Sequence, residues 1–175
     1  MNGKIVAGFV VASGLIAGIA IYYLQVYGYY TRLDPTGAGD VTLVAQATDT
    51  AEPIEYDAFQ AIDATSSPIR YRACFTTTTP LEVLSKTYQP AEDATPRNGP
   101  GWFDCYDAAV IGAALEEGSA KAFIGAKNVE YGVDRIVAIT ENGRGYVWHD
   151  LNNCGEKAYD GTVVGEDCPP RPGTN

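Results

Sequence analysis

The stretch IVAGFVVASGLIAGIAIYYL, residues 5–24, is twenty consecutive uncharged and mostly apolar residues. At about 1.5 Å of rise per residue, a helix of this length spans the roughly 30 Å hydrocarbon core of a bilayer. Lys4 is the only charged side chain among residues 1–30, so nearly all the charge follows this stretch. The sequence therefore predicts one transmembrane helix and a domain outside the bilayer.

The apolar stretch also has features of a cleavable signal peptide, because Gly18-Ile19-Ala20 resembles a signal-peptidase site. However, the apolar run continues through residues 22–24 and then meets an aromatic cluster suited to the membrane–water interface. This cluster contains Tyr27, Tyr29 and Tyr30. We therefore expect an uncleaved anchor over residues 1–30, a short Pro- and Gly-rich linker over residues 31–40, and one domain over residues 41–175.

The orientation of the anchor follows from the cysteines. Lys4 and Arg32 flank the span almost evenly, so the positive-inside rule gives little guidance. The chain has four cysteines, and all follow the span: Cys74, Cys105, Cys154 and Cys168. Two disulfides would place the domain in an oxidising compartment, hence a bacterial inner-membrane protein with a cytoplasmic N-terminus and a periplasmic domain. Four free thiols in a cytosolic domain are the alternative.

Four cysteines allow three connectivities. Cys154 and Cys168 lie in one turn-rich tail, whereas Cys74 ends a predicted strand and Cys105 opens a predicted helix. We prefer Cys74–Cys105, which joins sheet to helix, and Cys154–Cys168, which closes the tail.

Residues 41–175 are predicted to form a single α+β domain with an antiparallel sheet and two short helices. Thr79 and Pro80 mark the start of one helix, and Asp104 or Asp107 caps the other. Asn142-Gly143 favours a hairpin turn between two strands. The predicted strands are residues 41–48, 54–64, 68–76, 120–124, 135–140 and 146–150.

Small residues recur at helical spacing within the span. Gly14 and Gly18 lie on one face, with Ser13 and Ala17 beside them. Such residues let two helix backbones approach closely in lipid, although single-span anchors also contain them by chance. We interpret the four as a candidate helix-packing face toward an integral membrane protein complex.

Residues 31–175 carry 11 basic and 22 acidic side chains, a formal net charge of −11. This charge repels nucleic acid, so we expect no polynucleotide partner. It either serves solubility or attracts a basic periplasmic protein such as a c-type cytochrome.

Candidate catalytic chemistry is sparse. His149 is the only histidine, and its neighbour Asp150 would point to the opposite face of a strand. No zinc or calcium ligand pattern and no phosphate-binding glycine loop is present. We therefore predict no catalytic residues, no metal, no cofactor and no enzyme activity, with His149 structural.

Four aromatic residues are candidate interface anchors because they lie in a predicted loop or hairpin: Trp102, Phe103, Tyr146 and Trp148. The alternative is that they pack the core and flank the disulfides.

Several segments resemble an uncharacterised family of short, single-span proteobacterial inner-membrane proteins. They are the opening Met-Asn-Gly-Lys with the following apolar span, residues 66–75 (SSPIRYRACF), residues 102–105 (WFDC) and residues 148–156 (WHDLNNCGE). The resemblance covers nearly the whole chain but implies no activity, because the domain is one of unknown function. Such proteins are sometimes named histidine kinases automatically; this chain is too short and lacks an ATP-binding signature.

The leading hypothesis is a non-enzymatic accessory or assembly subunit of an inner-membrane complex, and we expect that complex to belong to an electron-transfer chain, respiratory or photosynthetic. The alternative is a membrane-anchored periplasmic ligand-binding or sensing module, with the aromatic loop and Arg70 and Arg72 lining its pocket.

Overall fold

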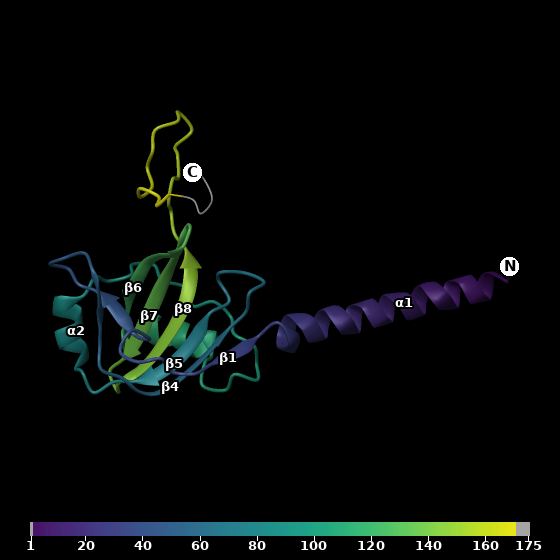
Figure 1. Ribbon diagram of the computed structural model, residues 1–175, viewed down its shortest axis with the longest axis horizontal. Helices are drawn as coiled ribbons and strands as arrows, with labels where there is room; N and C mark the ends of the chain where they lie inside the picture. Colours follow the sequence, from purple (N-terminus) through teal and green to yellow (C-terminus); the bar gives the residue numbers. More distant parts are fainter. Residues whose placement is uncertain (1, 171–175) are drawn as a thin grey trace.

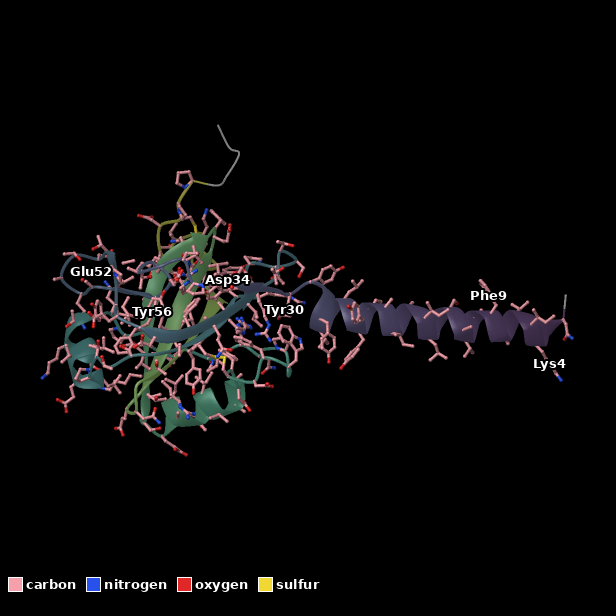
Figure 2. The ribbon with its side chains drawn as sticks, turned by 60° about the horizontal axis from the view of Figure 1, so that its bottom comes forward. Lys4, Phe9, Tyr30, Asp34, Glu52 and Tyr56 are labelled. Atoms are coloured by element: carbon pink, nitrogen blue, oxygen red, sulfur yellow. A yellow bond between two sulfur atoms is a disulfide. The ribbon has the colours of Figure 1, made fainter. Side chains whose placement is uncertain are left out.

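The computed structural model describes residues 2–170 and begins with a long apolar helix. Helix α1 (Gly3–Tyr23) continues into one π-helical turn (Leu24–Gly28), in which the amide of Tyr29 donates to the carbonyl of Leu24. Figure 1 shows this helix extending away from the rest of the molecule. Along it, Lys4 and Phe9 project from the helix with no other element beside them (Figure 2).

Within residues 2–170, one helical segment, Gly3–Gly28, is long and apolar enough to cross a membrane. None of its hydrophobic window is buried in the protein. A membrane anchor and a signal sequence share these properties. The membrane-length helix expected from the sequence is therefore present.

The domain is built on a six-stranded antiparallel sheet with strand order β1-β4-β5-β8-β7-β6 (Figure 1). Two further strands pair separately. The α+β prediction, with two short helices, is confirmed. The six strands are β1 (Thr31–Leu33), β4 (Asp57–Asp63), β5 (Arg72–Thr76), β8 (Arg144–Leu151), β7 (Val133–Thr140) and β6 (Ala120–Glu130); the separate pair is β2 (Thr42–Val44) and β3 (Ala51–Pro53).

Some elements differ from the predicted ranges. Strands β1 and β3 were not predicted, and β1 uses the first three residues of the predicted linker to pair with β4. The strand predicted over residues 41–48 is only the three residues of β2. In contrast, β6 runs to Glu130, past the predicted end at residue 124, with two irregularities in its pairing to β7.

Both faces of the sheet are buried. One face packs under α2 (Leu81–Thr87) and the β2–β3 pair, where Leu84 and Leu43 are fully buried. The other packs under α3 (Ala108–Glu116) and the loop before it, where Ile111 and Phe103 are buried. Two core clusters result, one on each side of the sheet.

The two short helices begin differently. Asp107 caps α3, because its carboxylate accepts hydrogen bonds from the amides of Ala109 and Val110, as predicted. The predicted Thr79 cap of α2 is wrong. The residue before α2 is Pro80, and no side chain caps this helix. The amide of Thr79 is instead held by the hydroxyl of Thr77 in the preceding turn.

Both predicted disulfides are present. Cys74 on β5 is bonded to Cys105 just before α3. Cys154 is bonded to Cys168 in the segment after β8, which leaves the sheet and projects from it (yellow in Figure 1).

A close contact between β5 and β8 depends on a glycine. Phe75 pairs with Gly145, and a Cβ atom on Gly145 would lie 2.0 Å from Cζ of the buried Phe75 ring. The ring therefore covers the backbone of the neighbouring strand. Any side chain at position 145 displaces it.

We predict that Gly145→Ala destabilises the domain by about 1–3 kcal/mol, because the Phe75 ring must leave its packed position. Gly112→Ala in α3 is the matched control. Its added Cβ meets no atom within 4 Å, so it stabilises by about 0.5–1 kcal/mol. Urea unfolding followed by tryptophan fluorescence compares the two; equal stability of Gly145→Ala and wild type would contradict the steric argument.

The two disulfides should contribute unequally. Replacing Cys74 and Cys105 with alanine is expected to lower the free energy of unfolding by about 2–4 kcal/mol, because this bond attaches the loop that covers the second core cluster to the sheet. Replacing Cys154 and Cys168 changes the unfolding of the sheet by less than about 0.5 kcal/mol, since residues 155–164 are exposed. Limited proteolysis should then cut the tail selectively.

Candidate functional site

The end of the membrane-length helix is fastened to the domain through Trp102. Its indole N–H donates to the carbonyl of Val26 at 2.6 Å. The ring stacks on Tyr27 with centroids 6.4 Å apart, and Tyr30 meets it edge-on at 5.9 Å. The aromatic cluster predicted as a membrane belt thus also binds the loop of the domain.

Two arginines complete this junction. The guanidinium of Arg70 donates to the backbone carbonyl of Gln25 at 3.0 Å and to the side-chain oxygen of the same residue. It also lies 5.6 Å from the ring centroid of Tyr30, while Arg32 lies 5.5 Å from that of Trp102. Figure 2 shows Tyr30 where the helix meets the domain. The junction, residues 25–32 with Arg70 and Trp102, is therefore held by directional contacts.

A cleft of about 590 Å³ lies beside this junction, and Arg70, Arg72 and residues 98–101 line it. The sequence suggested a ligand pocket lined by the aromatic loop with Arg70 and Arg72, and the two arginines do line this cleft, whereas Trp102 and Phe103 do not. Arg72, however, is buried, and its guanidinium group donates hydrogen bonds to four backbone carbonyls, those of residues 69, 71, 97 and 98. Burial lowers the pKa of Arg72. Because neutral oxygens of the protein already accept hydrogen bonds from both arginines, the two guanidinium groups have few donors left for a ligand in this cleft.

A second group of polar residues forms a row across four strands. His149 pairs with Arg135 between β8 and β7. Tyr71 lies opposite His149, one residue beyond the Arg72–Trp148 pair, and Asp63 on β4 lies opposite Tyr71 in the same way. The polar row, Asp63, Tyr71, His149 and Arg135, occupies the sheet face of the first core cluster, at the end that opens to solvent.

Members of the polar row contact one another closely. His149 stacks on Tyr71 with centroids 4.7 Å apart, and the guanidinium carbon of Arg135 lies 4.7 Å from the Tyr71 centroid. The Nδ1–H of His149 donates to the carbonyl of Pro68 at 2.9 Å, and Nε2 accepts from Arg135 Nε at 3.2 Å. Burial lowers the pKa of His149 to about 4 and raises the pKa of Tyr71 to about 12.

A cleft of about 680 Å³ opens over the polar row, and all four of its members line it. Asp63 and Arg135 are partly exposed there. Burial raises the pKa of Asp63, while the charge of Arg135 opposes that shift. No sequence pattern singles out either residue, because their proximity depends on strand register.

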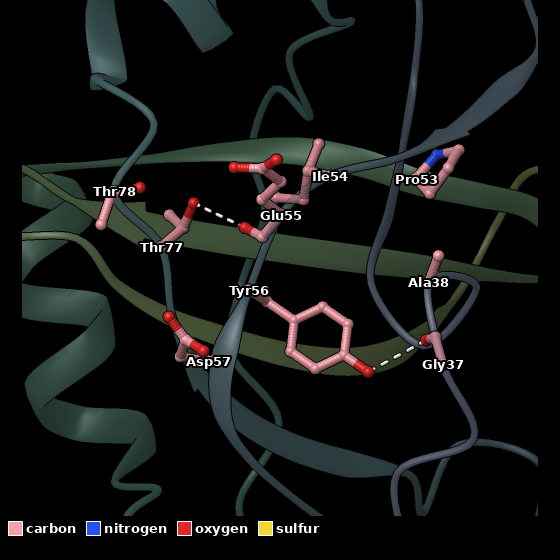
Figure 3. A pocket seen from close by; sticks show the side chains of 9 residues that line it. All are labelled: Gly37, Ala38, Pro53, Ile54, Glu55, Tyr56, Asp57, Thr77 and Thr78. Atoms are coloured by element: carbon pink, nitrogen blue, oxygen red, sulfur yellow. Dashed lines mark hydrogen bonds between the residues drawn. The ribbon is translucent and has the colours of Figure 1, made fainter.

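A third hollow, about 570 Å³, lies where the β3–β4 connection meets residues 37–38 and 77–78. Figure 3 shows the Tyr56 hydroxyl reaching across it to the carbonyl of Gly37. The same hydroxyl donates to Asp40 at 2.7 Å. Although burial opposes the change, hydrogen bonds from Thr36, Tyr56 and two backbone amides lower the pKa of Asp40 to about 2. The hydrogen bonds of these polar groups stabilise the turn at residues 36–40, so the groups are not free to bind a ligand.

The predicted helix-packing residues lie on an unobstructed surface. A Cβ at Gly14 or Gly18 would meet nothing within 4 Å, and Ser13 and Ala17 beside them are exposed. The hydroxyl of Ser13 donates to the carbonyl of Val10 within the helix. This face is sterically open to another helix.

The interface interpretation requires a correction for two aromatic residues. Trp148 is fully buried and Phe103 is 2 % exposed, both in the second core cluster. They pack the core because the loop and α3 cover that face of the sheet. Tyr146 is partly buried, with Tyr106 edge-on at 6.3 Å, and Trp102 contacts the helix end. The core interpretation thus accounts for Trp148 and Phe103.

Among residues 2–170 no group of three or more His, Cys, Asp or Glu side chains is placed to hold a metal ion. Asp150 accepts from Arg97 Nε at 2.9 Å and does not contact His149, as the strand geometry predicts.

The domain matches the profile of a family described as a family of unknown function, DUF6446, over residues 41–169. The chain belongs to this family. The match begins at the residue where the sequence places the start of the outer domain, and it fits the expected resemblance to an uncharacterised family. Comparison with curated proteins and with solved structures found no match.

We predict that His149 makes the domain less stable in acid. Above pH 6.5 the ring is neutral in both folded and unfolded chains; between pH 6.5 and about 4 only the unfolded chain takes up the proton readily. Stability therefore falls by up to about 3 kcal/mol across this window. Urea unfolding at several pH values measures the loss.

His149→Gln is the matched variant for this measurement, because it removes the titrating ring. Carboxylates titrate in both proteins, so their contribution largely cancels in the difference. Parallel pH dependence in the two proteins would show that His149 is not held neutral.

Proposed function

We propose that this protein is a non-enzymatic accessory or assembly subunit of a larger membrane complex. In this proposal α1 packs against a helix of the complex through the face containing Gly14 and Gly18. The membrane is a bacterial inner membrane, the N-terminus is cytoplasmic, and the domain lies in the periplasm, where its disulfides persist. The complex belongs to an electron-transfer chain, respiratory or photosynthetic, whose basic soluble carriers, such as c-type cytochromes, an acidic domain attracts.

The observation that carries the proposal is the directional junction between helix and domain. A simple tether needs only a flexible linker of Gly, Ser or Pro residues. Here Trp102 and Arg70 bind backbone carbonyls of Val26 and Gln25, and aromatic rings fill the space between them. Because this contact fixes the direction of the helix relative to the domain, a partner that binds the helix also determines where the domain lies.

The ligand-binding or sensing module remains the second candidate function. The observation that favours it is the cleft over the polar row, where Arg135 and the carboxylates of Asp63 and Glu130 line one cavity of about 680 Å³. The cleft at Arg70 and Arg72 supports this function less, because both guanidinium groups are held by the protein itself.

The accessory-subunit proposal is tested by purifying the tagged full-length protein from native membranes in mild detergent and identifying what accompanies it by mass spectrometry. We expect one membrane complex in stoichiometric amount. Replacing Gly14 and Gly18 with leucine should reduce its recovery at least tenfold, because bulky side chains hold the helices apart. Ala12→Leu is the control, because residue 12 lies on the opposite side of α1 from all four residues of the packing face, and it should leave recovery unchanged.

Migration of the wild-type protein alone would overturn the proposal. A complex retained equally by the Gly14/Gly18 variant and by the Ala12 variant would move the contact from the helix to the domain.

A further inference from the structure

We propose that the cleft over the polar row binds a small zwitterion, a molecule such as a free amino acid whose carboxylate and ammonium groups lie a few bonds apart. Arg135 would bind the carboxylate and Asp63 the ammonium group. The proposal names the ligand class for the second candidate function and is independent of the accessory-subunit proposal.

Arg135 is prepared to receive a carboxylate. Its guanidinium carbon lies over the Tyr71 ring, 4.7 Å from the centroid, and its Nε donates to His149, so two contacts restrict the position of the guanidinium group. Among residues 2–170, no acceptor takes a hydrogen bond from its two terminal nitrogens, although the side chain lines the cleft. A fixed guanidinium fork with free donors matches the two oxygens of a carboxylate.

His149 acts as a positioning residue for this arginine. Its Nδ1–H is committed to the carbonyl of Pro68, so Nε2 carries the lone pair that accepts from Arg135. The ring is buried between Tyr71 and the sheet. Arg135 is thus held by Tyr71 and His149, and among residues 2–170 no carboxylate forms an ion pair with it.

Asp63 supplies the opposite charge. One carboxylate oxygen accepts from the amide of Ala64 at 2.7 Å, and the other has no hydrogen-bond partner within the described chain. The ion pairs found among residues 2–170 are Arg97–Asp150 and Lys127–Asp49, so Asp63 and Arg135 do not pair directly. The cleft is therefore lined by one guanidinium group and by the carboxylates of Asp63 and Glu130, and no ion pair joins Arg135 to Asp63.

The combination of charges selects the ligand class. A simple carboxylate bound at Arg135 would lie near Asp63 and the exposed Glu130, both negative, and a simple amine bound at Asp63 would lie near Arg135. A zwitterion places an opposite charge against each group. The cleft volume of about 680 Å³ is within the range of small-molecule sites.

The test is a binding assay on the full-length protein in detergent. Thermal-shift screening with the twenty free amino acids identifies a ligand, and isothermal titration calorimetry measures its Kd. The ligand is then compared with the analogue lacking its amine and with the analogue lacking its carboxylate; for leucine these are 4-methylpentanoate and 3-methylbutylamine. We expect each analogue to bind at least tenfold more weakly.

Two variants locate the site. Arg135→Gln and Asp63→Asn should each weaken binding at least tenfold. Arg144 is an exposed arginine at the far end of β8, so Arg144→Gln should leave the Kd unchanged.

The proposal would be overturned by absence of binding of all twenty amino acids, by equal binding of a single-charge analogue, or by undiminished binding to both site variants. The ligand comparison uses wild-type protein, so it tests whether both charges of the ligand are required even if a variant fails to fold. The assay requires no partner complex, so its failure is distinct from failure of the accessory-subunit proposal.

Discussion

The bond between Cys74 and Cys105 is the constraint on which the rest of the arrangement depends. Cys74 lies on β5, inside the sheet, and Cys105 ends the loop that covers the second core. Trp102, three residues before Cys105, reaches the carbonyl of Val26. One covalent bond therefore links the middle of the sheet, the cover of its core and the attachment of the membrane-length helix.

Burial on both sides of the sheet explains why the exposure of side chains was harder to predict than the helix caps and turns. Two local signals were confirmed: Asp107 caps α3, and Gly143 adopts the positive φ angle that the Asn142-Gly143 turn requires, whereas the capping pattern at Thr79 was not. Burial was harder to predict. Val147 and Trp148 are adjacent yet both fully buried, because each faces a different core. A strand covered on both faces shows no alternation from which burial could be predicted.

Non-local features account for what the sequence could not predict. Strands β1 and β3 have three residues each, too few for a periodic pattern, and their pairing depends on partners elsewhere in the chain. The polar row needs the register of four strands before Asp63 and Arg135 become neighbours across one cleft. Arg70 and Arg72 were predicted to share a pocket and do line one, but their charges serve the fold.

The strand order also governs when the protein can fold during synthesis. Strand β5 lies between β4 and β8, and β8 is the last to be synthesised of the strands found among residues 2–170. Until β8 emerges, β5 has one unpaired edge, and Phe75 lacks the glycine backbone that it covers. The nascent domain therefore exposes an open sheet edge from the synthesis of β5 until β8 has been made. Pairing between strands so far apart in the sequence slows folding and favours aggregation. A chaperone that binds the free edge of β5 would therefore act during this interval.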